Sequence, residues 1–497
     1  MTDQHVDILV VGAGLSGIDA GYRIQTRTPG KTYAILEGRD TIGGTWDLFR
    51  YPGVRSDSDM FTLGYPFRPW TNPASISDGA SILAYIRDTA AAYGIDRHIR
   101  FGHRVVRAEW SSDDSRWTVE AQTGPDRELT TWTCSFLYLC CGYYSYAGGH
   151  EVDFPGRGDF GGRVVHPQQW PADLDHRGKR VVVIGSGATA VTLVPALAEQ
   201  AAHVTMVQRS PGHIVSRPTR DTFADRVRAV LPTGPAHRVV RAKNVLLGQL
   251  AYQYLRRRPR QAARMIEAGV ARQLNGTVPT DPHFRPRYDP WDQRLCLVPD
   301  GDFFRALRDG RAGVVTGQVQ GFTPTGVRLA SGEELPADIV VTATGLRMVA
   351  LGEVALTVDG RPVDPADRLV YKGMMLSGVP NMAWCVGYSN ASWTLRADLT
   401  AQYVCRLVNH MDRYGYTRCV PEAPSSDAAP SAPILELTSG YVQRAARYLP
   451  KQGTRRPWRL RQNYLLDAVD MRLGRVADGT MRFGGRVRTP QRTPSGA

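Results

Sequence analysis

The chain has 497 residues, of which 42% are hydrophobic and 22% charged, as is ordinary for a soluble globular protein with room for about three domains. Its formal net charge of +14 is compatible with nucleic acid, anionic lipid or phosphorylated cofactors as partners. The Lys and Arg residues are spread along the chain without a recognisable nucleic-acid module, so a solvated basic surface is favoured and nucleic acid is not expected.

The cysteines and the apolar stretches indicate the cellular compartment of the protein. Seven cysteines form an odd set without CxxC or metal-ligand spacing, which predicts a reduced, cytoplasmic protein and no metal site. The chain reaches its first apolar run, 6–11, without a basic leader or cleavage site, and no apolar stretch approaches the length of a membrane span. Secretion and a transmembrane anchor are therefore not expected.

The N-terminal part predicts a nucleotide-binding unit. A buried parallel strand at 6–11 runs into Gly12-x-Gly14-x-x-Gly17, and a helix at 18–27 leads to a second strand, 33–36, that closes on Glu37. Small residues let the backbone approach a pyrophosphate at a helix N-terminus, and the acid accepts hydrogen bonds from a ribose. With strand, helix and acid all in order, the dinucleotide motif is a strong signal.

The next stretch argues against thiol chemistry. A disulfide reductase with a similar layout would carry a redox cysteine pair just after Gly43-Gly44, whereas Trp46 stands there and no pair follows. Simple core packing of Trp46 is the alternative to a cofactor contact. An amphipathic helix at 81–93, paired strands at 101–119 and a buried strand at 136–142 follow, in which Cys140 and Cys141 are expected to be strand residues.

A second nucleotide-binding unit begins at residue 180. The strand 180–184 is followed by Gly185-x-Gly187-x-x-Ala190, a helix to about residue 200 and a strand at 203–208 that closes on Arg209-Ser210. A carboxylate at that position would repel a 2′-phosphate, whereas a guanidinium pairs with it bidentately. NADPH is therefore expected at the second site, and FAD at the first.

The remaining chain is predicted to combine a helical insertion with a return to the first unit. Apolar residues between 240 and 274 recur at helical spacing, with Pro259 breaking the two runs. A substrate-tunnel wall, a helix on an anionic membrane and a helical pair packed on the body all fit this pattern, and the last is favoured. The stretch 338–345 is a strand with a small-residue turn.

Between the two units lies Phe160-x-Gly162-x-x-x-His166-x-x-x-Trp170-Pro171, which resembles the fingerprint of Baeyer–Villiger monooxygenases, a branch of the class B flavin-dependent monooxygenases. An ordinary interdomain linker is the alternative. The segment from Gly43 to Asp57 is similar to the flavin-contacting loop of that class, and its continuation to Trp70 resembles the subgroup that contains the ethionamide-activating monooxygenase. The likeness runs from residue 6 to about residue 461.

The resemblance implies the chemistry of the site. Arg294, with Asp57 as its acidic partner, matches the arginine beside the flavin, and this pair is the expected catalytic pair. His166 is expected to couple conformational change to turnover, with the other fingerprint residues. Gln293 replaces a lysine that helps many relatives to hold the NADP phosphate. Motifs and resemblance together give these cofactor-binding residues: Gly12, Gly14, Ser16, Gly17, Glu37, Gly44, Thr45, Trp46, Asp47, Leu48, Arg55, Asp57, Val105, Gly185, Ser186, Gly187, Ala188, Thr189, Ala190, Arg209 and Ser210.

The resulting hypothesis is an α/β enzyme with two Rossmann-like domains, one for FAD and one for NADPH. It would insert one oxygen atom of dioxygen into ketones, giving esters or lactones, and oxygenate sulfur compounds through a flavin (hydro)peroxide. A heteroatom monooxygenase without ketone activity, and an NADPH oxidase or redox-sensing flavoprotein, are the alternatives. Small molecules and dioxygen are the expected partners, and peripheral membrane contact is an open option for this otherwise cytoplasmic protein.

The domain boundaries follow from the order of these motifs. We expect an FAD-binding domain in two parts, 1–150 and 341–485, and an NADPH-binding domain at 151–215 and 291–340 that includes the fingerprint linker 160–171. A helical insertion at 216–290 interrupts the NADPH-binding domain, and residues 486–497 are expected to be a disordered tail.

Overall fold

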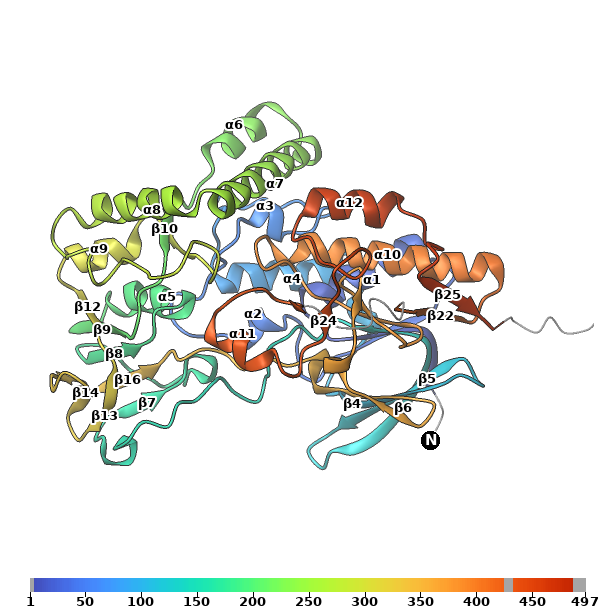
Figure 1. Ribbon diagram of the computed structural model, residues 1–497, viewed down its shortest axis with the longest axis horizontal. Helices are drawn as coiled ribbons and strands as arrows, with labels where there is room; N and C mark the ends of the chain where they lie inside the picture. The colour runs from blue at the N-terminus through green and yellow to red at the C-terminus, as the bar shows by residue number, and fades with distance from the viewer. Residues whose placement is uncertain (1–3, 424–431, 486–497) are drawn as a thin grey trace, which may run out of the picture.

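The computed structural model describes residues 4–423 and 432–485, so the predicted tail 486–497 lies outside the described residues. Two sheets, each with helices packed against it, organise the molecule, and Figure 1 shows them side by side with the N-terminal sheet on the right. The α/β class with two Rossmann-like units is what the two glycine motifs predict.

The larger sheet is built around the first predicted strand. β1 is fully enclosed in its second half because it pairs in parallel with β2 on one side and β6 on the other. A meander of antiparallel strands extends the sheet beyond β6, since alternating buried residues in β4 and β5 give each strand one core face. The strand order is β18-β17-β4-β5-β6-β1-β2-β3, with β21 also on β6. The bounds are β1 Gln4–Val11, β2 Tyr33–Leu36, β3 Ile99–Arg100, β4 Arg104–Ser111, β5 Arg116–Thr123, β6 Glu128–Leu139, β17 Ala355–Val358, β18 Arg361–Val363 and β21 Met382–Trp384.

The second sheet is parallel throughout, in the order β12-β9-β8-β16-β7. Its edge strand β7 comes from the fingerprint stretch, which is therefore part of the sheet as well as a connection. Helices α5 and α9 pack on this sheet. The bounds are β7 Arg163–Val165, β8 Arg180–Ile184, α5 Ala188–Leu197, β9 His203–Gln208, α9 Asp302–Arg308, β12 Ala312–Thr316 and β16 Ile339–Thr342.

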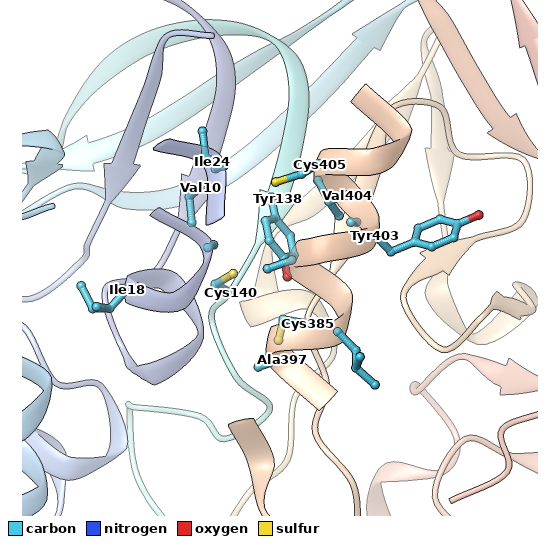
Figure 2. Packing of buried hydrophobic residues seen from close by; sticks show 14 of the residues in the cluster. Val10, Ile18, Ile24, Tyr138, Cys140, Cys385, Ala397, Tyr403, Val404 and Cys405 are labelled. Carbon is cyan, nitrogen blue, oxygen red and sulfur yellow. The ribbon is translucent and has the colours of Figure 1, made fainter. Parts of the chain in front are cut away.

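The main core lies between the larger sheet and two helices, α1 (Leu15–Arg27) and α10 (Trp393–Tyr414). Figure 2 shows Val10, Tyr138 and Ala397 in this layer, with the thiol of Cys140 between α1 and α10. Each large side chain buried in this way stabilises the fold by about 1.5–3 kcal/mol. Burial also raises the pKa of the neighbouring Cys141 thiol to about 12, so that thiol stays protonated at neutral pH.

Further elements complete the surfaces. α4 covers the first helix, and a small three-stranded sheet lies beside the second unit. Their bounds are α2 Thr45–Leu48, α3 Met60–Leu63, α4 Gly79–Ala92, β10 Ile214–Arg217, β11 Cys296–Pro299, β13 Val319–Thr323, β14 Gly326–Leu329, β15 Glu334–Pro336, β19 Val370–Tyr371, β20 Met375–Leu376, β22 Arg418–Pro421, β23 Ala432–Pro433, α11 Gly440–Ala445, β24 Lys451–Gln452, α12 Tyr464–Leu473 and β25 Met481–Gly484. Within 4–423 and 432–485, no helix combines the length and the apolar character needed to cross a membrane.

The stretch predicted to be helical forms α6 (Thr222–Val230), α7 (Thr233–Arg257) and α8 (Pro259–Leu274), along the upper edge of Figure 1. α7 ends where expected, because Pro259 lacks a backbone N–H and takes the first position of α8. A buried arginine, Arg241, attaches α7 to the body. Its Nη1 donates to the carbonyl oxygens of Phe61 (2.8 Å), Thr62 (3.2 Å) and Gly64 (2.8 Å) around the end of α3.

Replacing Arg241 should therefore loosen α7 from the body. Arg241→Met removes the Arg241 donor from three carbonyl oxygens, of which, in the described part of the chain, only that of Thr62 keeps another side-chain donor, the hydroxyl of Thr394. We expect the free energy of unfolding to fall by about 3 kcal/mol. Urea unfolding followed by tryptophan fluorescence measures this change. Arg238→Met, at an exposed position one turn earlier on the same helix, is the control. Equal midpoints for the two variants would contradict the anchoring role.

Candidate active site

A cavity of about 540 Å³ lies between the two sheets, and both nucleotide-binding units contribute to its wall. The structure brings together at this wall the following predicted site residues: Gly12, Gly14, Ser16, Glu37, Gly44, Thr45, Trp46, Arg55, Asp57, Val105, Ala188, Thr189 and Arg294. The other predicted cofactor residues do not line this cavity: Gly17, Asp47, Leu48, Gly185, Ser186, Gly187, Ala190, Arg209 and Ser210. Helices α6–α8 contribute no lining residue to this cavity.

The first glycine turn has the shape that a pyrophosphate requires. Gly12 has φ +101°, and a Cβ there would meet the carbonyl oxygen of Cys140 at 2.8 Å. A Cβ on Gly17 would lie 1.8 Å from the carbonyl oxygen of Gly12, so Gly17 shapes the turn without lining the cavity. The turn leaves Gly14 and Ser16 on the wall at the start of α1, where backbone N–H groups attract phosphate oxygens.

Glu37 lies at the end of β2 and is positioned by the backbone. Its Oε2 accepts a hydrogen bond from the N–H of Ala13 (2.7 Å) and its Oε1 from the N–H of Arg39 (2.9 Å). Burial raises the pKa of this carboxyl group. Each carboxylate oxygen can still accept a second hydrogen bond from the cavity, which fits the two hydroxyls of a ribose. The glycine turn and Glu37 together therefore fit FAD.

Asp47 holds the loop that carries Trp46. The buried carboxylate of Asp47 is paired with Arg39 and with Nη2 of Arg50 and of Arg87, both at 3.2 Å. The three guanidinium groups fix the short helix α2, and Trp46 on that helix lines the cavity while it also packs against the main core. Asp47 thus acts on the cavity through the loop.

The structure brings the predicted catalytic pair together. Nη1 of Arg294 lies 3.7 Å from Oδ2 of Asp57, with the side chains 33% and 38% exposed. The negative charge of Asp57 raises the pKa of Arg294, so the guanidinium is a permanent cation. Burial raises the pKa of the nearby Tyr441 to about 12, and this phenol stays neutral. A cation is therefore held at the cavity wall with much of its hydrogen-bonding capacity unused.

Sequence reasoning missed two tyrosines of the wall. Tyr143 and Tyr144 line the cavity just after β6, and the ring of Tyr143 meets that of Trp393 edge to face at 4.9 Å. Nε1 of Trp393 donates to Oγ of Ser16 (2.7 Å), which joins the start of α10 to the first glycine turn. The signal that could have found Tyr143 and Tyr144 is their position just after the carboxyl end of β6. The carboxyl ends of neighbouring parallel strands meet at one edge of a sheet, where ligands bind.

The second glycine turn faces the same cavity from the other side. Gly185 has φ +143°, and a Cβ there would lie 2.3 Å from the carbonyl oxygen of Ala343. α5 starts just beyond, so that Ala188 and Thr189 reach the cavity wall. Arg209 is exposed at the end of β9, and within the described ranges its guanidinium has no hydrogen-bond or ion-pair partner. These features fit a second dinucleotide that carries a 2′-phosphate group.

The fingerprint stretch contacts both places where the chain crosses between the sheets. Nδ1 of His166 accepts from the N–H of Gln168 (3.2 Å), so the proton is on Nε2, which donates to the carbonyl oxygen of Gly345 (3.3 Å). Burial lowers the pKa of His166 and keeps the ring neutral. Gln168 donates through Nε2 to the carbonyl oxygen of Ser145 (2.7 Å). His166 and Gln168 therefore connect the two crossings, at 142–150 and 343–350.

The other fingerprint residues support this arrangement. Phe160 is buried against Phe322, with ring centroids 5.9 Å apart. A Cβ on Gly162 would lie 2.2 Å from the carbonyl oxygen of Asp338. Trp170 packs on the core of the second sheet, and Pro171 follows it, half-buried. Phe160, Gly162 and Trp170 of the fingerprint thus each have a packing reason in this structure.

Two Rossmann-like units that open onto one cavity define the class of a flavoprotein linked to a pyridine nucleotide. A family model described as flavin-binding monooxygenase-like matches residues 59–231, and one described as an NAD(P)-binding Rossmann-like domain matches residues 10–72. The chain is 54% identical to "FAD-containing monooxygenase EthA" of Mycobacterium tuberculosis, over 97% of this chain and 98% of the relative. It is 45% identical to "Probable FAD-binding monooxygenase AlmA" of Acinetobacter baylyi, over 99% and 98%. The chain therefore belongs to the family of FAD-containing monooxygenases.

Solved structures support the fold. A steroid monooxygenase bound to NADP matches with a TM-score of 0.73 at 21% identity, over 97% of this chain and 99% of the other. The cyclohexanone monooxygenase of Rhodococcus sp. Phi1 bound to NADP+ matches with 0.68 at 21% identity, over 84% and 87%. The sequence-based recognition of the family, the two-unit fold and the pairing of FAD with NADP(H) are confirmed.

Proposed function

We propose that this FAD-containing monooxygenase is a Baeyer–Villiger enzyme that draws electrons from NADPH and inserts one oxygen atom of dioxygen into ketones. Sulfur compounds are a second class of substrate for the same cavity. The observation that carries this proposal is the position of Arg294, a permanent cation at the wall between the two nucleotide-binding units, beside Asp57. The bound FAD supplies the acceptor for hydride and the means to activate dioxygen.

The protein residues bind, orient and stabilise charge. The first glycine turn and Glu37 hold the FAD pyrophosphate and ribose, and Arg209 pairs with the 2′-phosphate of NADPH. Asp57 orients Arg294 at 3.7 Å, and the guanidinium stabilises negative charge that develops on the carbonyl oxygen of the ketone. His166 stays neutral and holds the crossings through its hydrogen bond to Gly345. As a residue of the hinge, His166 affects turnover without touching substrate.

Removing the cation should abolish ketone oxygenation without removing FAD. In Arg294→Ala we expect the flavin content to stay at the wild-type level and ester formation to fall by at least about a hundredfold, as for loss of a preorganised charge-stabilising donor. Rapid mixing of NADPH-reduced protein with oxygenated buffer, followed by flavin absorbance, tests the reaction with oxygen. The wild type should pass through a transient species that decays faster when a ketone is added.

The control is Arg287→Ala, an exposed arginine on the preceding loop, which should leave ester formation unchanged. Products are analysed with a ketone, with a sulfide and with no substrate. Sulfoxide without ester from the wild type would identify a heteroatom monooxygenase. Immediate reoxidation with stoichiometric hydrogen peroxide would identify an oxidase or sensor. Unchanged ester formation in Arg294→Ala would exclude the assigned role.

The nucleotide preference rests on Arg209. Because a guanidinium–phosphate pair contributes about 1.5–3 kcal/mol, Arg209→Ala should raise the KM for NADPH by about tenfold to a hundredfold and leave that for NADH nearly unchanged. Steady-state kinetics with both nucleotides measures the two values. An equal rise in both KM values would show that Arg209 does not read the 2′-phosphate.

We also propose that α7 and α8 form a peripheral contact with an anionic bilayer. Leu246, Leu247, Leu250 and Tyr254 form an outward stripe on α7, each 42–56% exposed. Four exposed arginines follow at the junction with α8, and within the described ranges none of them has an ion-pair partner: Arg257, Arg258, Arg260 and Arg264. Apolar side chains flanked by cations suit the interface of a membrane that contains anionic lipid.

Polar substitutions should remove this contact and spare catalysis. We expect Leu247→Ser/Leu250→Ser to lose co-sedimentation with vesicles of phosphatidylcholine and phosphatidylglycerol, because about 0.8 kcal/mol is lost per CH₂ group no longer buried. Leu129→Ser, at a 53% exposed position on β6 of the larger sheet, is the control. If the wild type does not bind these vesicles, or if both proteins bind alike, α7 is not a membrane contact.

A further inference from the structure

A second recess lies away from the active-site cavity, where α1, α10 and α12 meet. It has a volume of about 340 Å³, and four of its lining residues are arginines: Arg23, Arg27, Arg406 and Arg472, beside Pro66 and Gln402. Every charged residue of this lining is therefore a cation. None of these residues lines the cavity between the two sheets.

One carboxylate partly balances this charge. Asp398 accepts from Nε of Arg23 (2.7 Å) and from Nε2 of Gln402 (2.6 Å), and Nη2 of Arg472 lies 3.8 Å from it. The neighbouring Asp19 is fully buried, and burial together with the charge of Asp398 raises its pKa well above the usual value, so Asp19 stays neutral. Four guanidinium groups against one carboxylate leave an excess of three positive charges.

Two of the arginines are held rigidly and two are available. Arg406 donates to the carbonyl oxygens of Met471 (2.5 Å) and Gly474 (2.7 Å), which fixes its guanidinium at the end of α12. Arg23 is fixed by Asp398. Within the described ranges the guanidinium of Arg27 has no hydrogen-bond or ion-pair partner, and Arg472 has only its 3.8 Å approach to Asp398. The recess therefore combines preorganised walls with free donors.

We propose that this arginine recess binds a phosphate-bearing anion. The planar guanidinium fork matches phosphate oxygens bidentately, and several cations in one concave site recognise a dianion far better than a monoanion. Binding would also relieve the mutual repulsion of four arginines that share one carboxylate. A divalent phosphate group would reduce the excess from three positive charges to one.

The phosphate can come from a free anion or from a phospholipid headgroup. The neighbouring face of α12 exposes an apolar set next to Arg472, namely Leu465, Leu466, Val469 and Leu473, which are 42–77% exposed. Figure 1 shows α12 on the same side of the molecule as α7, and Tyr464 at its start packs against a small cluster that includes Val245 of α7. A lipid headgroup in the recess would place acyl chains along this face. The recess itself requires only the phosphate.

The test uses the full-length protein with FAD bound. Inorganic pyrophosphate is titrated into it by calorimetry at constant ionic strength, and wild type is compared with Arg27→Gln/Arg472→Gln. We expect saturable binding by the wild type and at least about tenfold weaker binding by the double variant, since two charge-assisted contacts are lost. Arg97→Gln/Arg361→Gln removes the same charge from exposed positions elsewhere. This control should bind like the wild type.

A second arm distinguishes the sources of phosphate. Co-sedimentation is measured with phosphatidylcholine vesicles, with and without phosphatidylglycerol. Loss of the phosphatidylglycerol-dependent part in Arg27→Gln/Arg472→Gln supports a lipid headgroup, and loss of pyrophosphate binding with unchanged vesicle binding supports a free anion. The proposal is overturned if the double variant matches the wild type in both arms, or if the charge-matched control loses binding to the same extent. Neither result depends on which substrate the monooxygenase oxidises.

Discussion

The active-site cavity depends on how the two sheets are held relative to one another. The chain crosses between them twice, and the crossings pair with each other: Tyr144 and Met348 form an antiparallel bridge, and the N–H of Ser145 donates to the carbonyl oxygen of Arg347 (2.8 Å). His166 adds a hydrogen bond from a third segment to Gly345. The two paired crossings can bend without leaving a charged group unpaired, because the imidazole of His166 beside them is neutral. This property suits a hinge between two cofactor sites.

Local patterns predicted the two nucleotide-binding units well because their constraints are local. Gly12 and Gly185 have positive φ and no room for a Cβ, so a strand that reaches them turns in one way only. The aromatic wall was not predictable in this manner. Tyr143 and Trp393 are 250 residues apart, and their contact depends on β6 and α10 meeting at one sheet edge. The strand β7 within the fingerprint could not be predicted for the same reason, because β7 forms only by pairing with the distant strand β16.

Two arginine–aspartate pairs in this protein show how structural and chemical roles differ. Arg396 and Asp467 are almost fully buried in close contact, and Asp467 also accepts from the hydroxyl of Tyr388 (2.8 Å). Such a pair has its hydrogen-bonding capacity used within the protein, and removal of either partner is costly. Arg294 and Asp57 lie 3.7 Å apart and remain about one-third exposed in a cavity. A cation held loosely enough to meet another anion is what charge stabilisation at a reacting carbonyl requires.

The positions of the arginines show where the net charge of +14 can act, which the total charge alone does not show. Many arginines are balanced locally, as Arg180 is by Asp338, whose pKa their hydrogen bond lowers to about 2. Arginines whose guanidinium has no hydrogen-bond or ion-pair partner within the described ranges include Arg209 at the end of β9, Arg257 and Arg260 at the junction of α7 and α8, and Arg27 in the recess between α1 and α12. Separate phosphate-bearing ligands account for the same charges with local contacts, because screening confines each cluster to its own surroundings within about 8–10 Å.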